Sequence, residues 1–371
     1  VAFSLQQYVD GIDLSELIEH FGGLGRPLPL SLVIRVVRDA ARGLHALHQA
    51  GVVHCDIKPA NLFLAASGGA MVGDFGIATD VRVSREPRGL SGTPLYMAPE
   101  QWAQRLLDRR ADLYALGGSA HHLATGRPPF PATTAVGLAV AHTSDPYEPP
   151  PVRSPREAYF YAVLGRLLQK DPGDRYPSGA ALSTDLGLID EAPPRLDAVS
   201  SDRAHLGDLR IGLYVGDLAG HGADAVVSAA NTALSMDVGV AAALRRAGGD
   251  AIAVEARGRS PAAMGDVVWT GAGQLRARHV AHAVAALGGA ICVGRTTLRA
   301  LIGAEARGLR RVAFPALGAG VGRVPPSLAA KLMLEAIATF AALRPQHVQN
   351  IDLVLFDEAT RQIFRDVLHA M

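Results

Sequence analysis

The feature that most constrains the fold of this 371-residue sequence is a change of hydrophobic pattern near its middle. Upstream, residues 30–51 repeat apolar side chains every three or four positions, which predicts a helix that ends at Gly51. Downstream, β-branched runs such as "DAVVSAA" and "IDLVLFD" alternate with Ala- and Leu-rich stretches, as in an α/β domain. Residues 190–207 between them carry Pro-Pro and Ser-Ser pairs with weak periodicity. We therefore expect two domains, 1–190 and 208–371, joined by a linker at 191–207.

Charge and cysteine content exclude several classes of protein. The 36 basic and 35 acidic residues nearly cancel, so no broad attraction to nucleic acid or anionic lipid is expected. Cys55 and Cys292 lie far apart without metal-type spacing, which favours a reduced cytoplasmic protein. No signal peptide is visible, and the longest apolar run, at 283–294, is too short and too glycine-rich for a membrane span.

Five motifs follow one another in the first half. They are "HCDIKPAN" (54–61), Asp74-Phe75-Gly76, "GTPLYMAPE" (92–100), "ADLYALG" (111–117) and "KDPGDRY" (170–176). A lone Asp-Phe-Gly is usually a turn, and a lone Asp with a nearby Lys is usually a solvated pair. In this order and spacing, however, the motifs resemble the eukaryotic-type Ser/Thr protein kinases of bacteria. The resemblance covers residues 1–190 and implies a mainly α-helical kinase C-lobe.

The resemblance assigns roles that fit phosphoryl transfer, which needs positioning and charge neutralisation. It implies that Asp56 accepts or orients the proton of a Ser or Thr hydroxyl on a protein substrate. Lys58 would lie near the phosphate that moves from ATP, and Thr93 would position Asp56 and Lys58. Asn61 and Asp74 would hold Mg²⁺.

Further motif residues are implied to support this loop. Glu100 and Arg175 would form a buried ion pair, and Asp112 would brace the catalytic loop. Cys55 departs from the family, because most relatives have an Arg there that binds a phosphate on the activation loop. We hypothesise that this kinase does not depend on activation-loop phosphorylation, for example at Ser84 or Ser91. The alternative is that Cys55 is a small buried residue without a role.

The segment ahead of the catalytic loop is short. "AFSLQQYVDG" (2–11) resembles the last strand of the small lobe and the hinge, with Gln6 as gatekeeper and Gln7, Tyr8 and Val9 meeting adenine. No lysine precedes Lys58, and the glycines at 22–25 indicate the end of a helix rather than a phosphate loop. We expect a truncated N-lobe and poor nucleotide binding by this chain alone, with activity in the full-length parent. A pseudokinase is the alternative.

The second half resembles the macro domain family. "LRIGLYVGDLAGHGADAVVSAANTAL" (209–234), "VAFPALGAGVGRVP" (312–325) and "IDLVLFD" (351–357) carry the likeness, and residues 265–284 fit a central pair of strands. The resemblance covers most of 208–371. It implies an α/β/α fold with a mixed central sheet, and ADP-ribose or a related nucleotide as ligand.

The glycine-rich loop suggests how that ligand is bound. Because glycine tolerates positive φ and close approach, such a loop can turn several N–H groups toward one anion, and the helix after the first loop favours negative charge at its N-terminus. The resemblance implies that Asp217 binds adenine, Asn231 the distal ribose, and that Phe356 lies near adenine with Asp357 capping the site. The implied phosphate-binding residues are Gly239, Gly318, Ala319, Gly320, Val321 and Gly322.

Departures from the macro family favour a binding role over hydrolysis. Asp237 replaces a glycine of the first loop and would place a carboxylate near a diphosphate unless it turns outward. Relatives that hydrolyse ADP-ribose from proteins have Asp, Asn and His where this chain has Ala241, Ser228 and Arg245. The leading hypothesis is a Ser/Thr kinase whose macro domain binds ADP-ribose or an ADP-ribosylated protein. A pseudokinase scaffold with an ADP-ribose reader and an ADP-ribosyl hydrolase are the alternatives.

Overall fold

The computed structural model divides the chain into two compact units. The first comprises Val1–Gln7, Asp13–Leu64 and Gly69–Ala192, and the second Tyr8–Ile12, Ala65–Gly68 and Pro193–Met371. The structure describes residues 7–75, 79–80, 92–192, 194–285 and 289–371. The predictions for Gln6, Gly76, Ser84 and Ser91 fall outside the described residues.

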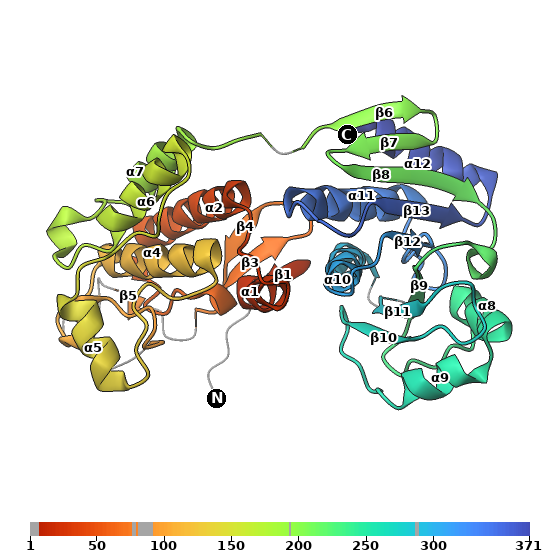
Figure 1. Ribbon diagram of the computed structural model, residues 1–371, viewed down its shortest axis with the longest axis horizontal. Helices are drawn as coiled ribbons and strands as arrows, with labels where there is room; N and C mark the ends of the chain where they lie inside the picture. Colours follow the sequence, from red (N-terminus) through yellow and green to blue (C-terminus); the bar gives the residue numbers. More distant parts are fainter. Residues whose placement is uncertain (1–6, 76–78, 81–91, 193, 286–288) are drawn as a thin grey trace. The chain divides into compact units, whose positions relative to one another are not determined.

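The described part of the chain up to Ala192 is mostly helical (Figure 1). Its small sheets have the order β1-β3-β4 and β2-β5, and helix α2 packs against α4 and α7, while α4 packs against α6. The helices are α1 (Leu14–Gly23), α2 (Leu30–Gln49), α3 (Pro99–Trp102), α4 (Arg109–Thr125), α5 (Ala135–Ser144), α6 (Pro155–Leu167) and α7 (Gly179–Gly187). The strands are β1 (Gly11–Asp13), β2 (Val52–Val53), β3 (Leu62–Ala65), β4 (Ala70–Val72) and β5 (Thr79–Asp80), with 3₁₀ turns η1 (Pro59–Asn61) and η2 (Pro172–Asp174).

Helix α2 confirms the helix predicted from residues 30–51. Val33, Val37 and Leu44 recur at helical spacing and are buried, so one face of α2 joins the core. The helix ends just before Gly51, which has the left-handed φ of 82° that favours glycine. This helix leads directly into β2 and the catalytic loop.

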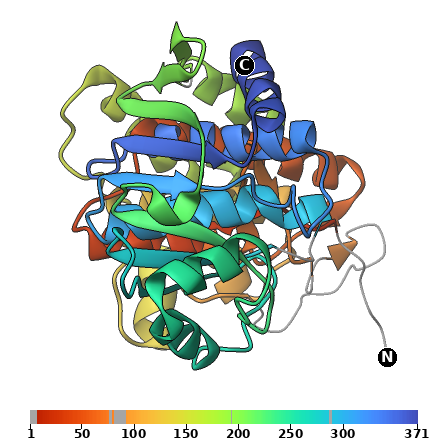
Figure 2. The same cartoon turned by 90° about the vertical axis from the view of Figure 1, so that its right-hand side faces the viewer.

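The second unit is built on an eight-stranded mixed sheet with the order β10-β11-β9-β12-β13-β8-β7-β6 (Figure 2). The pairs β11–β9, β9–β12, β12–β13 and β13–β8 are parallel, and the remaining pairs are antiparallel. The strands are β6 (Leu196–Ser200), β7 (Arg203–Leu206), β8 (Leu209–Val215), β9 (Ala225–Ala230), β10 (Val267–Gly271), β11 (His279–Val284), β12 (Arg311–Phe314) and β13 (Asn350–Leu355). The expected mixed central sheet is therefore present.

Two expectations about this sheet need correction. Most of the linker expected at 191–207 forms the hairpin β6–β7, which extends the sheet. In β7, Ala204 and Leu206 are buried whereas Arg203 and His205 are exposed, an alternation too short to stand out in the sequence. Residues 265–284 do form paired strands, but β10 is an edge strand rather than a central one.

Helices cover both faces of the sheet, with α10 and α11 on one face and α8 and α9 on the other (Figure 1). Helix α12 packs on β8 and on α11. The helices are α8 (Gly239–Gly248), α9 (Asp250–Arg257), α10 (Val293–Ala306), α11 (Pro326–Ala342) and α12 (Glu358–Ala370), with 3₁₀ turns η3 (Leu218–Gly220) and η4 (Gly289–Cys292). None of the helices in the described ranges is long and apolar enough to cross a bilayer.

The parallel strands determine where functional residues can gather. Strands β8, β9, β12 and β13 run in one direction, so their carboxyl ends meet at the same edge of the sheet. Ligands of open α/β sheets bind in the crevice outside the carboxyl ends of such strands. The segments that leave this edge contain Asp217, Asn231, the glycine-rich loop 318–322 and Phe356.

Candidate active site and ligand cavity

A hydrogen-bonded cluster centres on Asp56, in the loop between β2 and β3. Thr93 donates from Oγ1 to Asp56 Oδ1 at 2.8 Å, and Lys58 Nζ donates to Asp56 Oδ2 at 2.7 Å. Lys58 Nζ also donates to Thr93 Oγ1 at 3.1 Å. The side chains of Lys58 and Asp56 remain partly exposed, so an acceptor hydroxyl can reach the carboxylate. The structure thus brings together three of the predicted catalytic residues.

Asn61 is tied to the same loop. Its Nδ2 donates to the carbonyl oxygen of Asp56 at 2.8 Å and to Oδ2 of Asp56 at 3.2 Å, which leaves the amide oxygen as the atom available for a cation. The N–H of Gly73 donates to the carbonyl of Asn61 at 2.9 Å, so the exposed Asp74 directly follows a residue held beside Asn61. Amide and carboxylate oxygens are the hard ligands that Mg²⁺ prefers, and this pair fits the predicted metal site.

The catalytic loop is held from beneath by buried Asp112. Its carboxylate accepts hydrogen bonds from the N–H groups of His54 and Cys55, both at 2.8 Å, and pairs with Nε2 of His48 at 2.7 Å. Cys55 is buried, has a positive φ of 67° that few non-glycine residues adopt, and directs its thiol toward the carbonyl of Val53 at 3.6 Å. The predicted bracing by Asp112 is therefore present as hydrogen bonds.

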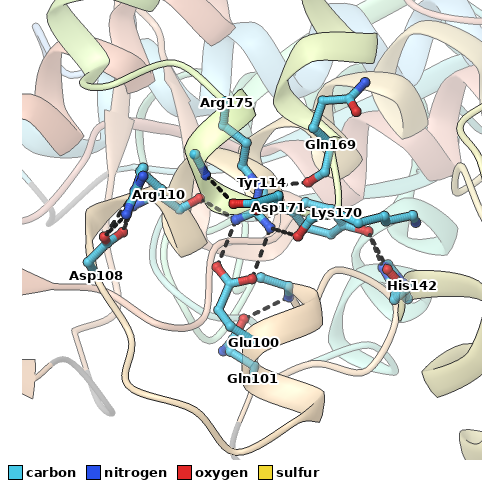
Figure 3. Close-up of polar contacts among 12 residues, drawn as sticks. Glu100, Gln101, Asp108, Arg110, Tyr114, His142, Gln169, Lys170, Asp171 and Arg175 are labelled. Carbon is cyan, nitrogen blue, oxygen red and sulfur yellow. Dashed lines mark hydrogen bonds and ion pairs between the residues drawn. The ribbon is translucent and has the colours of Figure 1, made fainter. Parts of the chain in front are cut away.

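Glu100 and Arg175 form the predicted buried ion pair (Figure 3). Two guanidinium nitrogens donate to the two carboxylate oxygens at 2.7 and 2.9 Å. The remaining donors of Arg175 reach the carbonyls of Gln169, Lys170 and Arg110, and its guanidinium lies over the ring of Tyr114 at 4.7 Å. All five N–H donors of this fully buried side chain are therefore satisfied, as burial of a charge requires.

Gln101 is a supporting residue that sequence reasoning missed. Its Nε2 donates to the carbonyl of Cys55 at 2.9 Å, and its Oε1 accepts from the N–H of Ala98 at 2.9 Å. The buried amide therefore joins the catalytic loop to the loop before α3. Only its place directly after Glu100 could have hinted at this, because the sequence carries no sign of a contact across 46 residues.

The residues predicted to meet adenine in the kinase half remain predictions. Gln7 is exposed and Val9 is half-buried, and both lie outside helices and strands.

A cavity of about 880 Å³ opens in the second unit at the carboxyl edge of its parallel strands. Every predicted ligand residue of this half lines it, which places them together around one space. They are Asp217, Asn231, Gly239, Gly318, Ala319, Gly320, Val321, Gly322 and Phe356, joined by Asp357.

Two sets of backbone N–H groups line this cavity without an acceptor among the described residues. One set is the first turn of α8, at Gly239, Val240 and Ala241, where no side chain caps the helix. The other is at 320–322 in the glycine-rich loop. Gly318 has a φ of 80°, and a Cβ there would lie 2.9 Å from Val293 and Val324, so only glycine fits. Unpaired N–H groups in segments that line one cavity can form a site for an anion.

Side chains at the cavity are held by local hydrogen bonds. Asp217 accepts from the N–H of Ala219 at 3.0 Å, and the amide of Asn231 is paired with Ser235. Asp357 accepts from the N–H of Thr360 at 2.7 Å, and this bond lowers the pKa of its carboxyl. Phe356 is 91% exposed at the rim, available to stack on a planar group.

The structure also shows where the residues that depart from the macro-domain pattern lie relative to the cavity. Ala241 lines the cavity, so a methyl group stands at the position for which the resemblance implies a carboxylate in hydrolytic relatives. Ser228 is buried in β9 and does not line the described cavity. Asp237 lines it, and its Oδ1 accepts from Arg245 at 2.9 Å, so its charge is paired.

Two family models match separate parts of the chain. Residues 3–186 match the family model of the protein kinase domain, and residues 227–333 match that of the macro domain.

Curated relatives match the first half. The Ser/Thr-protein kinase PknB of Mycobacterium tuberculosis is 32% identical over 206 residues, which is 54% of this chain and 32% of that protein. PknA of Corynebacterium glutamicum is 33% identical over 197 residues, or 52% of this chain and 41% of that protein. Pkn1 of Myxococcus xanthus is 40% identical over 187 residues, or 48% of this chain and 26% of that protein. The chain spans about a third of the length of the PknB relative.

Solved structures match the second half. A macrodomain of Oceanobacillus iheyensis with ADP aligns with a TM-score of 0.43 and 24% identity, covering 45% of this chain and 94% of that one. The Trypanosoma brucei macrodomain in complex with ADP aligns with a TM-score of 0.41 and 26% identity, covering 43% of this chain and 68% of that one. On the family models, the chain contains a protein kinase domain followed by a macro domain.

Proposed function

We propose that the first half transfers the γ-phosphoryl group of ATP to Ser or Thr hydroxyls of a protein substrate. The hydrogen-bonded cluster of Asp56, Lys58 and Thr93 carries this proposal. The Asp56 carboxylate accepts the hydroxyl proton while the hydroxyl oxygen bonds to the γ-phosphorus. The bond from phosphorus to the β,γ-bridging oxygen breaks, and ADP leaves. Lys58 offers its ammonium to the phosphoryl oxygens while it holds the carboxylate in place.

Asn61 and Asp74 are the residues that would hold Mg²⁺. Bound there, the cation supplies charge neutralisation for the ATP phosphates. The chain's own contribution is orientation, because the bonds from Asn61 Nδ2 to Asp56 fix the amide relative to the catalytic carboxylate.

Label transfer from ATP to a mixture of Ser/Thr proteins tests the kinase proposal. The protein is assayed as this chain and, if its gene encodes residues ahead of Val1, also together with those residues. We expect phosphoserine and phosphothreonine to appear and EDTA to abolish them. A pseudokinase scaffold predicts no transfer in either form.

For the second half, we propose binding of ADP-ribose or a related nucleoside diphosphate. The two sets of unpaired N–H groups around one cavity carry this proposal, because they can surround a diphosphate. Asp217 would accept from the adenine amino group, Phe356 would stack on adenine, and Asn231 would bind the distal ribose. An ADP-ribosylated protein offers the same group and is the natural macromolecular partner.

Ala241 favours binding over hydrolysis. It lines the cavity where hydrolytic relatives carry Asp, and a methyl group cannot act as general base. Cys55 and Cys292 are not joined in a disulfide, which supports the proposal that the protein acts in the reducing cytoplasm, where ATP is also available.

Calorimetric titration of the chain with ADP-ribose tests the binding proposal. We expect saturable binding that Asp217→Ala weakens, since the substitution removes the acceptor for the adenine amino group. Robust release of ADP-ribose from a mono-ADP-ribosylated protein would instead establish the hydrolase alternative.

A further inference from the structure

Arg245 connects three segments beside the macro-domain cavity. Its NH1 donates to Oδ1 of Asp237, in the loop before α8, at 2.9 Å, and its Nε donates to Oδ1 of Asp250, in the first turn of α9, at 2.6 Å. Asp237 lines the cavity, whereas Arg245 and Asp250 do not. A planar guanidinium that bonds two carboxylates has little freedom to reorient, so Arg245 fixes the direction of the Asp237 side chain.

Of the carboxylates that line the cavity, Asp237 is the one that we expect to repel a bound diphosphate most strongly. It precedes by two residues the unpaired N–H groups that begin at Gly239. Of the other acidic residues that line the cavity, Asp217 and Asp357 each accept a backbone N–H of their own turn. Arg246 is the sole basic residue that lines the cavity in the described part of the chain. An unbalanced charge at Asp237 would therefore repel the ligand where the loop is meant to attract it.

We propose that Arg245 is a positioning residue of this cavity: it draws the Asp237 carboxylate aside and balances its charge, so that the first loop accepts the diphosphate of a nucleotide. This inference rests on the proposed binding function and deepens it. It explains how a loop that has an acidic residue in place of glycine can still bind an anion. In this proposal Arg245 acts through Asp237 and does not contact the ligand.

A double-mutant cycle on the full chain, with ADP-ribose as probe, tests the inference. Arg245→Gln frees the carboxylate, and we expect affinity to fall about two- to fivefold at low salt, the range of an exposed charge pair. Asp237→Asn alone should leave affinity unchanged or improve it. The double variant Asp237→Asn/Arg245→Gln should recover the wild-type affinity, because no carboxylate remains to repel the ligand.

Two further measurements separate charge from structure. The loss in Arg245→Gln should shrink in 1 M KCl, where the screening length falls to about 3 Å. Arg257→Gln removes an exposed arginine of α9 that does not line the cavity, and it should bind as the wild type does. A thermal melt of each variant reports whether the fold is retained.

The outcomes distinguish this inference from the binding proposal. If the wild type does not bind ADP-ribose, the binding function fails and the inference with it. If the wild type binds and Arg245→Gln binds equally well, only the role of Arg245 is overturned. A loss in Arg245→Gln that the Asp237→Asn change does not relieve, or that persists at high salt, assigns Arg245 a merely structural role.

Discussion

At the scale of single residues, the candidate active site of the first half depends on buried charged groups whose hydrogen bonds are satisfied. Asp112 accepts three hydrogen bonds beneath the catalytic loop, and Arg175 uses all five of its donors. Pairing of this kind is what allows charged groups to be buried. Removing one partner therefore costs more than the pair contributes by itself.

Glu100→Ala tests whether removing one partner of the buried ion pair destabilises the fold. The substitution leaves the guanidinium of Arg175 buried without its carboxylate, and we expect the free energy of unfolding of the first unit to fall by about 3–5 kcal/mol. Denaturant titration measures the change. Glu19→Ala, at an exposed position of α1, is the matched control and should stay within about 0.5 kcal/mol of the wild type. An equal, small effect of both substitutions would contradict the account.

Gly318→Ala tests the need for glycine in the second phosphate loop. The added Cβ meets Val293 and Val324 at 2.9 Å and the positive φ disfavours alanine, so we expect a stability loss of at least about 1–2 kcal/mol. ADP-ribose affinity should fall with it, because the N–H groups of the loop move. Gly220→Ala, where a Cβ meets nothing within 4 Å, is the control. Unchanged binding in Gly318→Ala would show that the loop does not hold the ligand.

At the scale of elements, the sequence predicts those with strong periodicity and misses those with weak signals. Helix α2 was predicted from its helical periodicity, and strands β9, β12 and β13 from their short β-branched runs. Strand β8 was expected only through the resemblance to the macro domain. The hairpin β6–β7 was predicted as a linker, since its two short strands surround a Ser-Ser-Asp turn. Asp202 in that turn accepts from Arg361 and Arg365 of α12, a long-range anchor that no local pattern reveals.

The candidate sites follow the same rule. Residues inside motifs, such as Asp56 and Asn231, could be named in advance because the motif types carry known chemistry. Gln101 and the Arg245–Asp250 bond could not, because their partners are set by how helices and loops pack. The edge position of β10 was missed for a related reason: strand order depends on the whole sheet.

His142 of α5 makes the first unit sensitive to acid. The buried ring bonds the hydroxyl of Tyr114 on α4 at 2.9 Å, and burial, aided by the charge of Lys170, lowers its pKa to about 4. The unfolded chain, with a histidine pKa of about 6.5, binds more protons between these values. The contribution of neutral His142 to the free energy of unfolding is thus complete above about pH 6.5 and is lost as pH falls toward 4.

Denaturant titrations between pH 4 and 7 check this. We expect stability to decline as pH falls through that window, and His142→Gln to reduce the slope. Burial also lowers the pKa of His121 to about 4. Part of the pH dependence of stability should therefore remain in the His142→Gln variant. Gln49→Ala, which removes no titratable group at an exposed position of α2, should leave the slope as it is. A slope unaffected by His142→Gln would refute the assignment.

At the scale of the whole molecule, the two proposals give one chain both a phosphoryl-transfer site and a diphosphate-binding site. The first domain presents a carboxylate, an ammonium and an amide for moving a phosphoryl group. The second presents backbone N–H groups that, in the proposed function, would hold a diphosphate. If both proposals hold, the combination would suit a kinase that responds to ADP-ribose or to ADP-ribosylated proteins.

The most direct test of this account is label transfer from ATP with Mg²⁺, comparing the wild type with Asp56→Asn. If the gene encodes residues ahead of Val1, the protein is assayed both with and without them. We predict transfer to Ser or Thr by the wild type and a loss of at least about a hundredfold in Asp56→Asn, since the proton acceptor is gone. Asp197→Asn, which alters an exposed carboxylate in β6, should transfer normally. Absence of transfer by the wild type, or equal transfer by Asp56→Asn, would contradict the account.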